Sequence, residues 1–274
     1  MNKFIFFPFE IILLCVAVQS SSRAAPDDRP LSVQQLSMGF VSTVNRADPL
    51  LLTATPVSVA SVKNWSGATS CNRLYGLKEL NLSAAAFAGR FGKTVLAASL
   101  SRFGFELYKE QKIAIGFATQ VFSRLQAGIV VRYQQISIKN YGQAGTVVLD
   151  AGWQYSLSSA TTITGAFHNI HRATIGKGKQ PLPQVLQVGI RYSPVSKICT
   201  VAEIYKDVSY TPEVRFGVEA NLLASLSLRA GFTRNPARFT GGFGLHFAEF
   251  SLDYAFAYHP VLGYTHALGI SISR

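Results

Sequence analysis

A two-residue alternation of apolar and small or polar side chains runs through most of this chain, and it constrains the fold more than any other feature. It is clear from Val147 to Tyr155, where the odd positions are apolar and the even positions include Asp150, Gly152 and Gln154. Successive side chains of a β-strand point to opposite faces, so such a segment predicts a strand with one apolar face. From Trp65 onward, segments of roughly ten residues with this period are separated by turn-forming residues, which is typical of a membrane β-barrel.

The second face of these segments distinguishes a membrane barrel from a soluble β-sandwich. In a sandwich the apolar face is the core, and the other face meets water with frequent charged residues. Here the second face is rich in Gly, Ser and Gln, and only 15% of all residues are charged, against about 25% in typical soluble domains. After the N-terminal segment, no apolar run approaches the roughly 20 residues of a membrane-spanning helix. We therefore expect lipid on the apolar face and a packed interior on the other.

Counting the alternating segments predicts an all-β fold, an outer-membrane antiparallel β-barrel of about 14 strands. An even number of strands is the rule for bacterial single-chain barrels. The expected strands cover residues 62–72, 78–88, 93–103, 110–119, 124–138, 145–156, 160–170, 183–193, 196–206, 212–221, 225–234, 238–247, 249–258 and 263–273.

The connections between these strands alternate in length. Membrane barrels have short periplasmic turns and longer outer loops, and the longest connection, His171 to Leu182, falls among the outer loops if the last strand ends in the periplasm. Most Lys and Arg residues of the connections lie at the same end. The position of these basic residues predicts that the outer loops contact outer-membrane lipid, with Lys and Arg binding the phosphates of an anionic glycolipid. Ordinary solvated loop charge is the alternative explanation.

The N-terminal part of the chain does not follow the alternation. Residues 1–25 have the pattern of a secretory signal peptide, because Lys3 precedes an apolar stretch and small and polar residues follow it. This predicts export to the cell outer membrane. Residues 26–60 are too irregular for a strand, and we expect a hatch inside the barrel, with a peripheral periplasmic arm as the alternative. Residues 61–274 form the predicted transmembrane barrel.

The formal net charge is +12, and such basicity indicates an anionic partner. The basic residues are scattered and no nucleic-acid recognition motif accompanies them, so we expect no nucleic acid. After the signal segment the cysteines are Cys71 and Cys199, which we expect to be free thiols. The sequence contains no CxxC, HExxH or Cys/His cluster, so we expect no metal and no cofactor.

Ten ionisable residues fall on the predicted interior face. Neighbouring strands could pair Arg132 with Asp150, and Arg215 with Glu203 or Glu219. Such residues form cross-strand ion pairs that fix register and hold the hatch, or contact a ligand in the lumen. Four Arg against four carboxylates predict no ionic selectivity. The lumen polar candidates are Arg132, Asp150, Arg191, Glu203, Arg215, Glu219, Arg229, Asp253, His168 and His246.

Catalytic residues are not indicated. A hydrolase needs a nucleophile, a base and a group that orients the base. The chain has five histidines, but no serine motif identifies a partner for any of them. We therefore expect a protein that is not an enzyme.

Four segments carry a family resemblance: RLYGLKEL (73–80), SRFGFELYKE (101–110), NYG (140–142) and LDYAFAYHPVLGYTHALGISIS (252–273). Together they resemble the PorV/PorQ family of outer-membrane proteins, and the resemblance implies a FadL-like barrel with 14 strands. MGFVSTVNRADPLLLTATP (38–56) resembles the N-terminal hatch of that family. The chain departs from the family in ending Ser-Ile-Ser-Arg, without a terminal aromatic residue.

Three functions remain open from the sequence. The resemblance implies a non-enzymatic accessory component of protein secretion or surface display, with secretion-system components or exported proteins as partners. The alternative is a FadL-like channel for small hydrophobic compounds, gated by the N-terminal segment. The third is a structural barrel that anchors partners or lipid and transports nothing.

Overall fold

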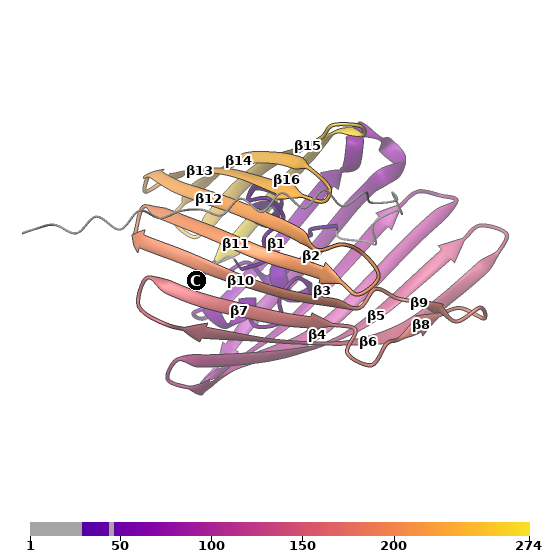
Figure 1. Cartoon of the computed structure of the whole chain (residues 1–274), viewed down its shortest axis with the longest axis horizontal. Helices are drawn as coiled ribbons and strands as arrows, with labels where there is room; N and C mark the ends of the chain where they lie inside the picture. The colour runs from indigo at the N-terminus through magenta and orange to yellow at the C-terminus, as the bar shows by residue number, and fades with distance from the viewer. Residues whose placement is uncertain (1–28, 44–46) are drawn as a thin grey trace, which may run out of the picture.

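The computed structural model describes residues 29–43 and 47–274 of the chain, so the expected signal peptide at residues 1–25 lies outside the described residues. Fourteen antiparallel strands close into one barrel, which confirms the predicted fold class (Figure 1). Consecutive strands are neighbours throughout, except that β7 pairs with β10 because β8 and β9 form a separate two-stranded hairpin.

Every predicted strand boundary lies within three residues of an observed one. The barrel strands are β1 Trp65–Arg73, β2 Asn81–Phe91, β3 Thr94–Gly104, β4 Tyr108–Phe122, β5 Leu125–Ile138, β6 Gly142–Ser156, β7 Thr161–His168, β10 Val185–Val195, β11 Ile198–Asp207, β12 Glu213–Leu223, β13 Leu226–Arg234, β14 Arg238–Phe247, β15 Phe250–His259 and β16 Gly263–Ser273. The hairpin strands are β8 Thr174–Ile175 and β9 Gln180–Pro181, and the connection between β1 and β2 contains the 3-10 turns η3 Leu74–Gly76 and η4 Lys78–Leu80.

Apolar side chains cover the outside of the barrel. On β12, Val214 and Phe216 are 49% and 47% exposed, whereas Arg215 between them is 1% exposed. A soluble barrel would show the opposite arrangement, because burial of apolar surface is its main source of stability. Among the described residues, no helix is long and apolar enough to cross a membrane.

The barrel closes at a seam between its first and last strands. β1 pairs with β16 from Ser66 opposite Ser273 to Arg73 opposite His266. The carbonyl oxygen of Arg274 extends this ladder, because it accepts hydrogen bonds from the backbone N–H groups of Asn64 at 3.1 Å and Trp65 at 3.3 Å. This closure leaves no exposed strand edge at the seam.

The described residues before β1 fill the barrel interior, and we call residues 29–43 and 47–62 the plug (Figure 1). The plug contains the short helix α1 Val33–Ser37 and the 3-10 turns η1 Pro49–Thr53 and η2 Ser58–Ser61. The Ser32 hydroxyl caps α1, and the Asp48 carboxylate caps η1 by accepting a hydrogen bond from the Leu50 N–H at 2.9 Å. All five residues of α1 are buried.

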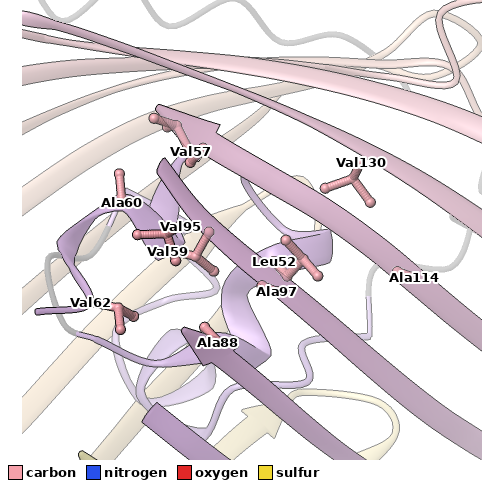
Figure 2. Close-up of a cluster of buried hydrophobic side chains, with 11 residues drawn as sticks. Leu52, Val57, Val59, Ala60, Val62, Ala88, Val95, Ala97, Ala114 and Val130 are labelled. Atoms are coloured by element: carbon pink, nitrogen blue, oxygen red, sulfur yellow. The ribbon is translucent and has the colours of Figure 1, made fainter. Parts of the chain in front are cut away.

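Small inward side chains of the strands make room for the plug. Leu52, Val57, Val59 and Val62 of the plug pack on inward side chains of β2 to β5, which include Ala97 (Figure 2). Burial of each large apolar side chain contributes about 1.5–3 kcal/mol. The small-residue face seen in the sequence is therefore the surface on which the plug packs.

Candidate functional site

The ten polar residues predicted for the lumen lie on barrel strands, and the structure brings most of them into three groups. The first group centres on Arg229 of β13, which is 5% exposed. Its Nε donates to Oε2 of Glu219 at 2.7 Å, and its Nη1 donates to Oδ1 of Asp253 at 2.5 Å. Both carboxylates come from neighbouring or nearby strands, so this group ties β12, β13 and β15 together.

The second group centres on Arg215 of β12. Its Nη1 lies 3.4 Å from Oε1 of Glu203, and its Nε lies 3.3 Å from Oε1 of Glu213. Of the two partners expected from the sequence, Arg215 therefore contacts Glu203, while Glu219 contacts Arg229. Breaking such a buried pair by removing one partner leaves an uncompensated charge.

The third group joins Arg132, Asp150 and His168. Arg132 Nη2 lies 3.3 Å from Oδ2 of Asp150, and His168 Nδ1 lies 3.6 Å from the same oxygen. The other oxygen of Asp150 accepts a hydrogen bond from the Asn169 N–H at 2.8 Å. This group links β5, β6 and β7 on the inside of the barrel.

Arg191 and His246 lie at the end of the barrel where the short turns are. Arg191 donates to the hydroxyls of Thr162 and Ser193 at 3.1 and 3.2 Å. The ring nitrogens of His246 each lie 2.9 Å from a hydroxyl oxygen, that of Ser227 or that of Ser251. Both residues therefore contact side chains of other residues on the barrel strands.

The first two ion-pair groups also hold the plug. Oε2 of Glu203 accepts hydrogen bonds from the Ser42 N–H at 2.9 Å, the Ser42 hydroxyl at 2.7 Å and the Thr43 hydroxyl at 3.1 Å. Arg215 Nη1 donates to the Phe40 carbonyl at 2.8 Å. A further bond runs from Gln34 Nε2 to Glu219 Oε2 at 3.0 Å. The wall charges thus satisfy backbone and side-chain groups of the plug in addition to one another.

Several residues that hold the plug were not among the sequence candidates. Glu110 of β4 accepts hydrogen bonds from Arg29 of the plug at 2.7 and 2.6 Å. Arg90 of β2 donates to the Ala60 and Val62 carbonyls at 2.5 and 2.7 Å. The parity of the predicted strand 110–119 was the available signal for Glu110, since it is in phase with the inward residues of β4.

Two wall glycines let the plug backbone approach the wall backbone directly. A Cβ atom at Gly217 of β12 would overlap with the Met38 carbonyl oxygen, and one at Gly231 of β13 would overlap with the Gly39 nitrogen. Only glycine leaves this space free. The plug is therefore seated against the wall with no room for a side chain between them.

Residues of the plug line two cavities inside the barrel. The loop-end cavity, of about 110 Å³, lies toward the long connections and is lined by Gln35 of α1 together with residues of β3 to β11. The turn-end cavity, of about 210 Å³, lies toward the short turns and is lined by Gln34 of α1, Asp48, and residues of β1, β15 and β16. Burial raises the pKa of the Asp48 carboxyl, against the hydrogen bonds that this carboxyl accepts from Ser32 and the Leu50 N–H. Adjacent residues of one short helix thus face different cavities.

Metal ligands do not cluster in the part of the chain that the structure describes. It contains no group of three or more His, Cys, Asp or Glu residues placed to hold a metal ion. Cys71 is exposed and Cys199 is half-buried, and both are free thiols.

The closed antiparallel barrel and its filled lumen place the fold in the FadL-like type of 14-stranded barrel. Similar solved structures include the toluene transporter TbuX of Ralstonia pickettii, with a TM-score of 0.70 and 13% identity over 88% of this chain and 97% of that chain. The toluene transporter TodX of P. putida has a TM-score of 0.71 and 11% identity, over 90% and 99% of the two chains. A FadL homologue of Pseudomonas aeruginosa has a TM-score of 0.65 and 9% identity, over 89% and 98%.

At these identities the likeness establishes the fold alone. No family model matches the sequence, and no curated protein sequence matches it.

Proposed function

We propose that this chain is a non-enzymatic outer-membrane channel for small hydrophobic compounds, and that the plug controls their passage. The observation that carries the proposal is the pair of cavities on the two sides of α1, inside a barrel whose fold is that of the toluene transporters. Each cavity is a place where a small molecule can rest, and residues of the plug line both of them.

The size of the cavities favours small compounds. An engineered protein cavity of about 150 Å³ binds benzene, and the two cavities have volumes of about 110 and 210 Å³. The plug residues that line them, such as Val33, Leu50 and Leu31, are at most 8% exposed. A compound therefore passes from one cavity to the other by local movement of the plug.

The apolar outer face of the barrel supports the membrane location. Large apolar side chains exposed around the barrel, such as Leu100, Ile115 and Ile270, have no role in water but suit a lipid environment. We propose the outer membrane as that environment, with the long connections outside and their basic residues against anionic glycolipid phosphates.

The secretion role implied by the PorV/PorQ resemblance remains a prediction. The similar solved structures include hydrocarbon channels and a FadL homologue, and they favour the channel over the secretion role. Capture of exported proteins by crosslinking through the outer loops in native membranes would revive the secretion role.

Uptake of labelled toluene by intact cells tests the proposal. We would express the chain in a Gram-negative host without related channels and compare Ser101→Trp with Leu100→Trp. Ser101 is buried and lines the loop-end cavity, whereas its neighbour Leu100 points to the outside and is 58% exposed. We expect wild type and Leu100→Trp to speed uptake and Ser101→Trp to abolish the gain.

Equal uptake with and without the chain would contradict the channel and leave the anchoring role as the better explanation. Equal uptake by the two tryptophan variants would contradict the route through the loop-end cavity. Heat-dependent gel mobility of each variant establishes that its barrel is folded.

A further inference from the structure

The outer surface of four neighbouring strands, β3 to β6, ends in one apolar row on the loop side (Figure 1). The side chains of this row are between 43% and 58% exposed, and each is the cross-strand partner of the next. The row consists of Leu100, Ile113, Tyr133 and Val147. It therefore marks the loop-side limit of the surface that suits acyl chains.

The next side chains toward the loops on these strands are polar. Side chains two residues apart on a strand share a face, so these polar side chains also point outward. Arg102 pairs with Gln111 and Gln111 with Gln135, while Lys109 and Gln143 flank Ser137 one row farther out. We call this set the outer polar patch: Arg102, Lys109, Gln111, Gln135 and Gln143.

The outer polar patch lies at the level of the lipid headgroups. Arg102 is two residues from the end of β3 at Gly104, and Lys109 is the second residue of β4, so both cations are at the loop end of the barrel. A lipid-facing cation destabilises a barrel most at the middle of the bilayer and least near the interface. The two charges are thus placed beside the phosphates of lipid molecules whose acyl chains cover the apolar row.

The positive charge of the patch is not neutralised within the described part of the chain. Neither Arg102 nor Lys109 forms an ion pair with a described residue. Of the carboxylates next to them in sequence, Glu106 pairs with Lys139, and Glu110 faces the inside of the barrel. An anionic group outside the chain therefore complements the patch.

Three amide side chains lie beside the two cations. Gln135 Nε2 donates to Gln143 Oε1 at 2.8 Å, and Gln111 is the ladder partner of both Arg102 and Gln135. An amide group both donates and accepts hydrogen bonds, as the hydroxyls of a sugar do. Cations with amides alongside match a phosphorylated sugar better than a bare phosphate, and the apolar row adds a surface for acyl chains.

The rim formed by β14 to β16 is different. Phe239 and Tyr264 are exposed there, and Tyr258 packs on Tyr264 with ring centroids 4.9 Å apart. Aromatic side chains are the usual residues at the membrane interfaces of barrels. The cations and amides on β3 to β6 are therefore a local feature and indicate a site for a particular headgroup.

We propose that the outer polar patch binds the phosphorylated headgroup of an outer-leaflet glycolipid. The phosphate lies on Arg102 and Lys109, which are diagonal in the ladder because Lys109 is the partner of Gly104. Diagonal positions are about 7–8 Å apart, a separation that two long side chains span around one phosphate. The sugar lies on the amides and the acyl chains lie on the apolar row. This inference rests on the outer-membrane location proposed above, and it does not depend on passage of compounds through the lumen.

Native mass spectrometry of the purified full chain in detergent measures this binding. The probes are bisphosphorylated lipid A and the same lipid after removal of both phosphates. We expect the phosphorylated form to bind at least about tenfold more tightly, the effect of one charge-assisted hydrogen bond. Millimolar inorganic phosphate should not displace it, because free phosphate lacks the sugar and acyl contacts. Displacement would identify a site for free phosphate and overturn the proposal.

The double substitution Arg102→Gln with Lys109→Gln tests the two cations. We expect about tenfold weaker binding of phosphorylated lipid A and unchanged binding of the dephosphorylated lipid. The matched control is Lys177→Gln with Lys179→Gln, which removes the same charge from exposed positions between β7 and β10 and should change neither affinity. Heat-dependent gel mobility establishes that each barrel is folded, and Arg102→Gln alone decides if the double variant is not.

Equal binding of the two lipids by the wild type would overturn the inference, as would unchanged binding by the double variant. Equal losses in the double variant and its control would do the same, because they would mean attraction by overall charge. The toluene uptake assay reports on the channel separately, and the double variant should match the wild type there because the patch is on the outside of the wall. A lipid preference without uptake would leave the site and remove the channel, and uptake without a lipid preference would do the reverse.

Discussion

Single glycines set how closely the plug approaches the wall. Gly231→Ala would place a methyl group against the backbone nitrogen of Gly39, so the backbone of the plug or of the wall would have to shift. Overpacking of this kind costs about 1–3 kcal/mol, so we expect a lower midpoint in urea unfolding followed by tryptophan fluorescence. Gly178→Ala is the control, since a Cβ atom there would have no neighbour within 4 Å. Equal midpoints for the two variants would contradict direct backbone packing.

Glu203 contacts both the plug, through Ser42 and Thr43, and the charged Arg215 of the wall. Glu203→Gln keeps the shape of the side chain but removes the charge that faces Arg215, which is 1% exposed. Removal of one partner of a buried ion pair costs about 3–5 kcal/mol. Glu249→Gln, from a solvent-exposed pair with Arg274, should cost at most about 1 kcal/mol. Urea unfolding measures both, and similar losses would mean that Glu203 does not hold the plug.

For single residues, the sequence predicted which face of a strand each side chain occupies. It did not predict which side chains contact one another. Alternation alone predicted the interior position of Arg215, but the choice between Glu203 and Glu219 depends on strand register, which one sequence does not fix. The plug contacts of Glu203 could not be predicted from the sequence either. Ser42 lies 161 residues from Glu203 in sequence, and no local pattern relates them.

Among the elements, the strands were predictable and the connection from β7 to β10 was not. A strand of ten residues repeats its period several times, whereas β8 and β9 have two residues each and show no period. β7 ends at His168, two residues earlier than expected, because Asn169 adopts a φ of 54° that interrupts the ladder. The local signal was an asparagine, which tolerates this conformation better than most residues.

The side chain of Asn169 holds the connection between β7 and β10 in place through hydrogen bonds. This predicts how readily a protease cleaves that connection. Its Nδ2 donates to the Leu182 carbonyl at 3.0 Å, and its Oδ1 accepts from the Ala173 N–H at 2.7 Å. We expect Asn169→Ala to release the connection and speed tryptic cleavage at Lys177 and Lys179 several-fold. Asn140→Ala controls for loss of an asparagine at positive φ; equal cleavage in both variants would contradict the fastening role.

At the scale of the whole molecule, the seam between β1 and β16 predicts a specific crosslink. Leu268 lies directly opposite Cys71 in the ladder, and both side chains face outward. Leu268→Cys therefore brings two thiols within the Cα separation of about 4.4–6.8 Å that a disulfide requires. Oxidation should close a covalent loop from residue 71 to residue 268, which alters mobility on a denaturing, non-reducing gel.

The control is Ile270→Cys, whose partner in the ladder is Thr69 and which lies diagonal to Cys71. Diagonal neighbours are about 7–8 Å apart, so we expect little crosslinking. Efficient crosslinking of both variants, or of neither, would contradict the register of the seam.

The position of the plug, directly before β1, has a consequence for biogenesis. β1 is joined on one side to the plug and closed on the other by β16, the last strand of the chain. The wall that surrounds the plug is therefore complete only when the final hairpin pairs with β1, and we expect the plug to lie within the curved sheet by then. We infer that the barrel closes around the plug, and that the wall glycines against which the plug packs matter for the order of assembly as well as for the finished barrel.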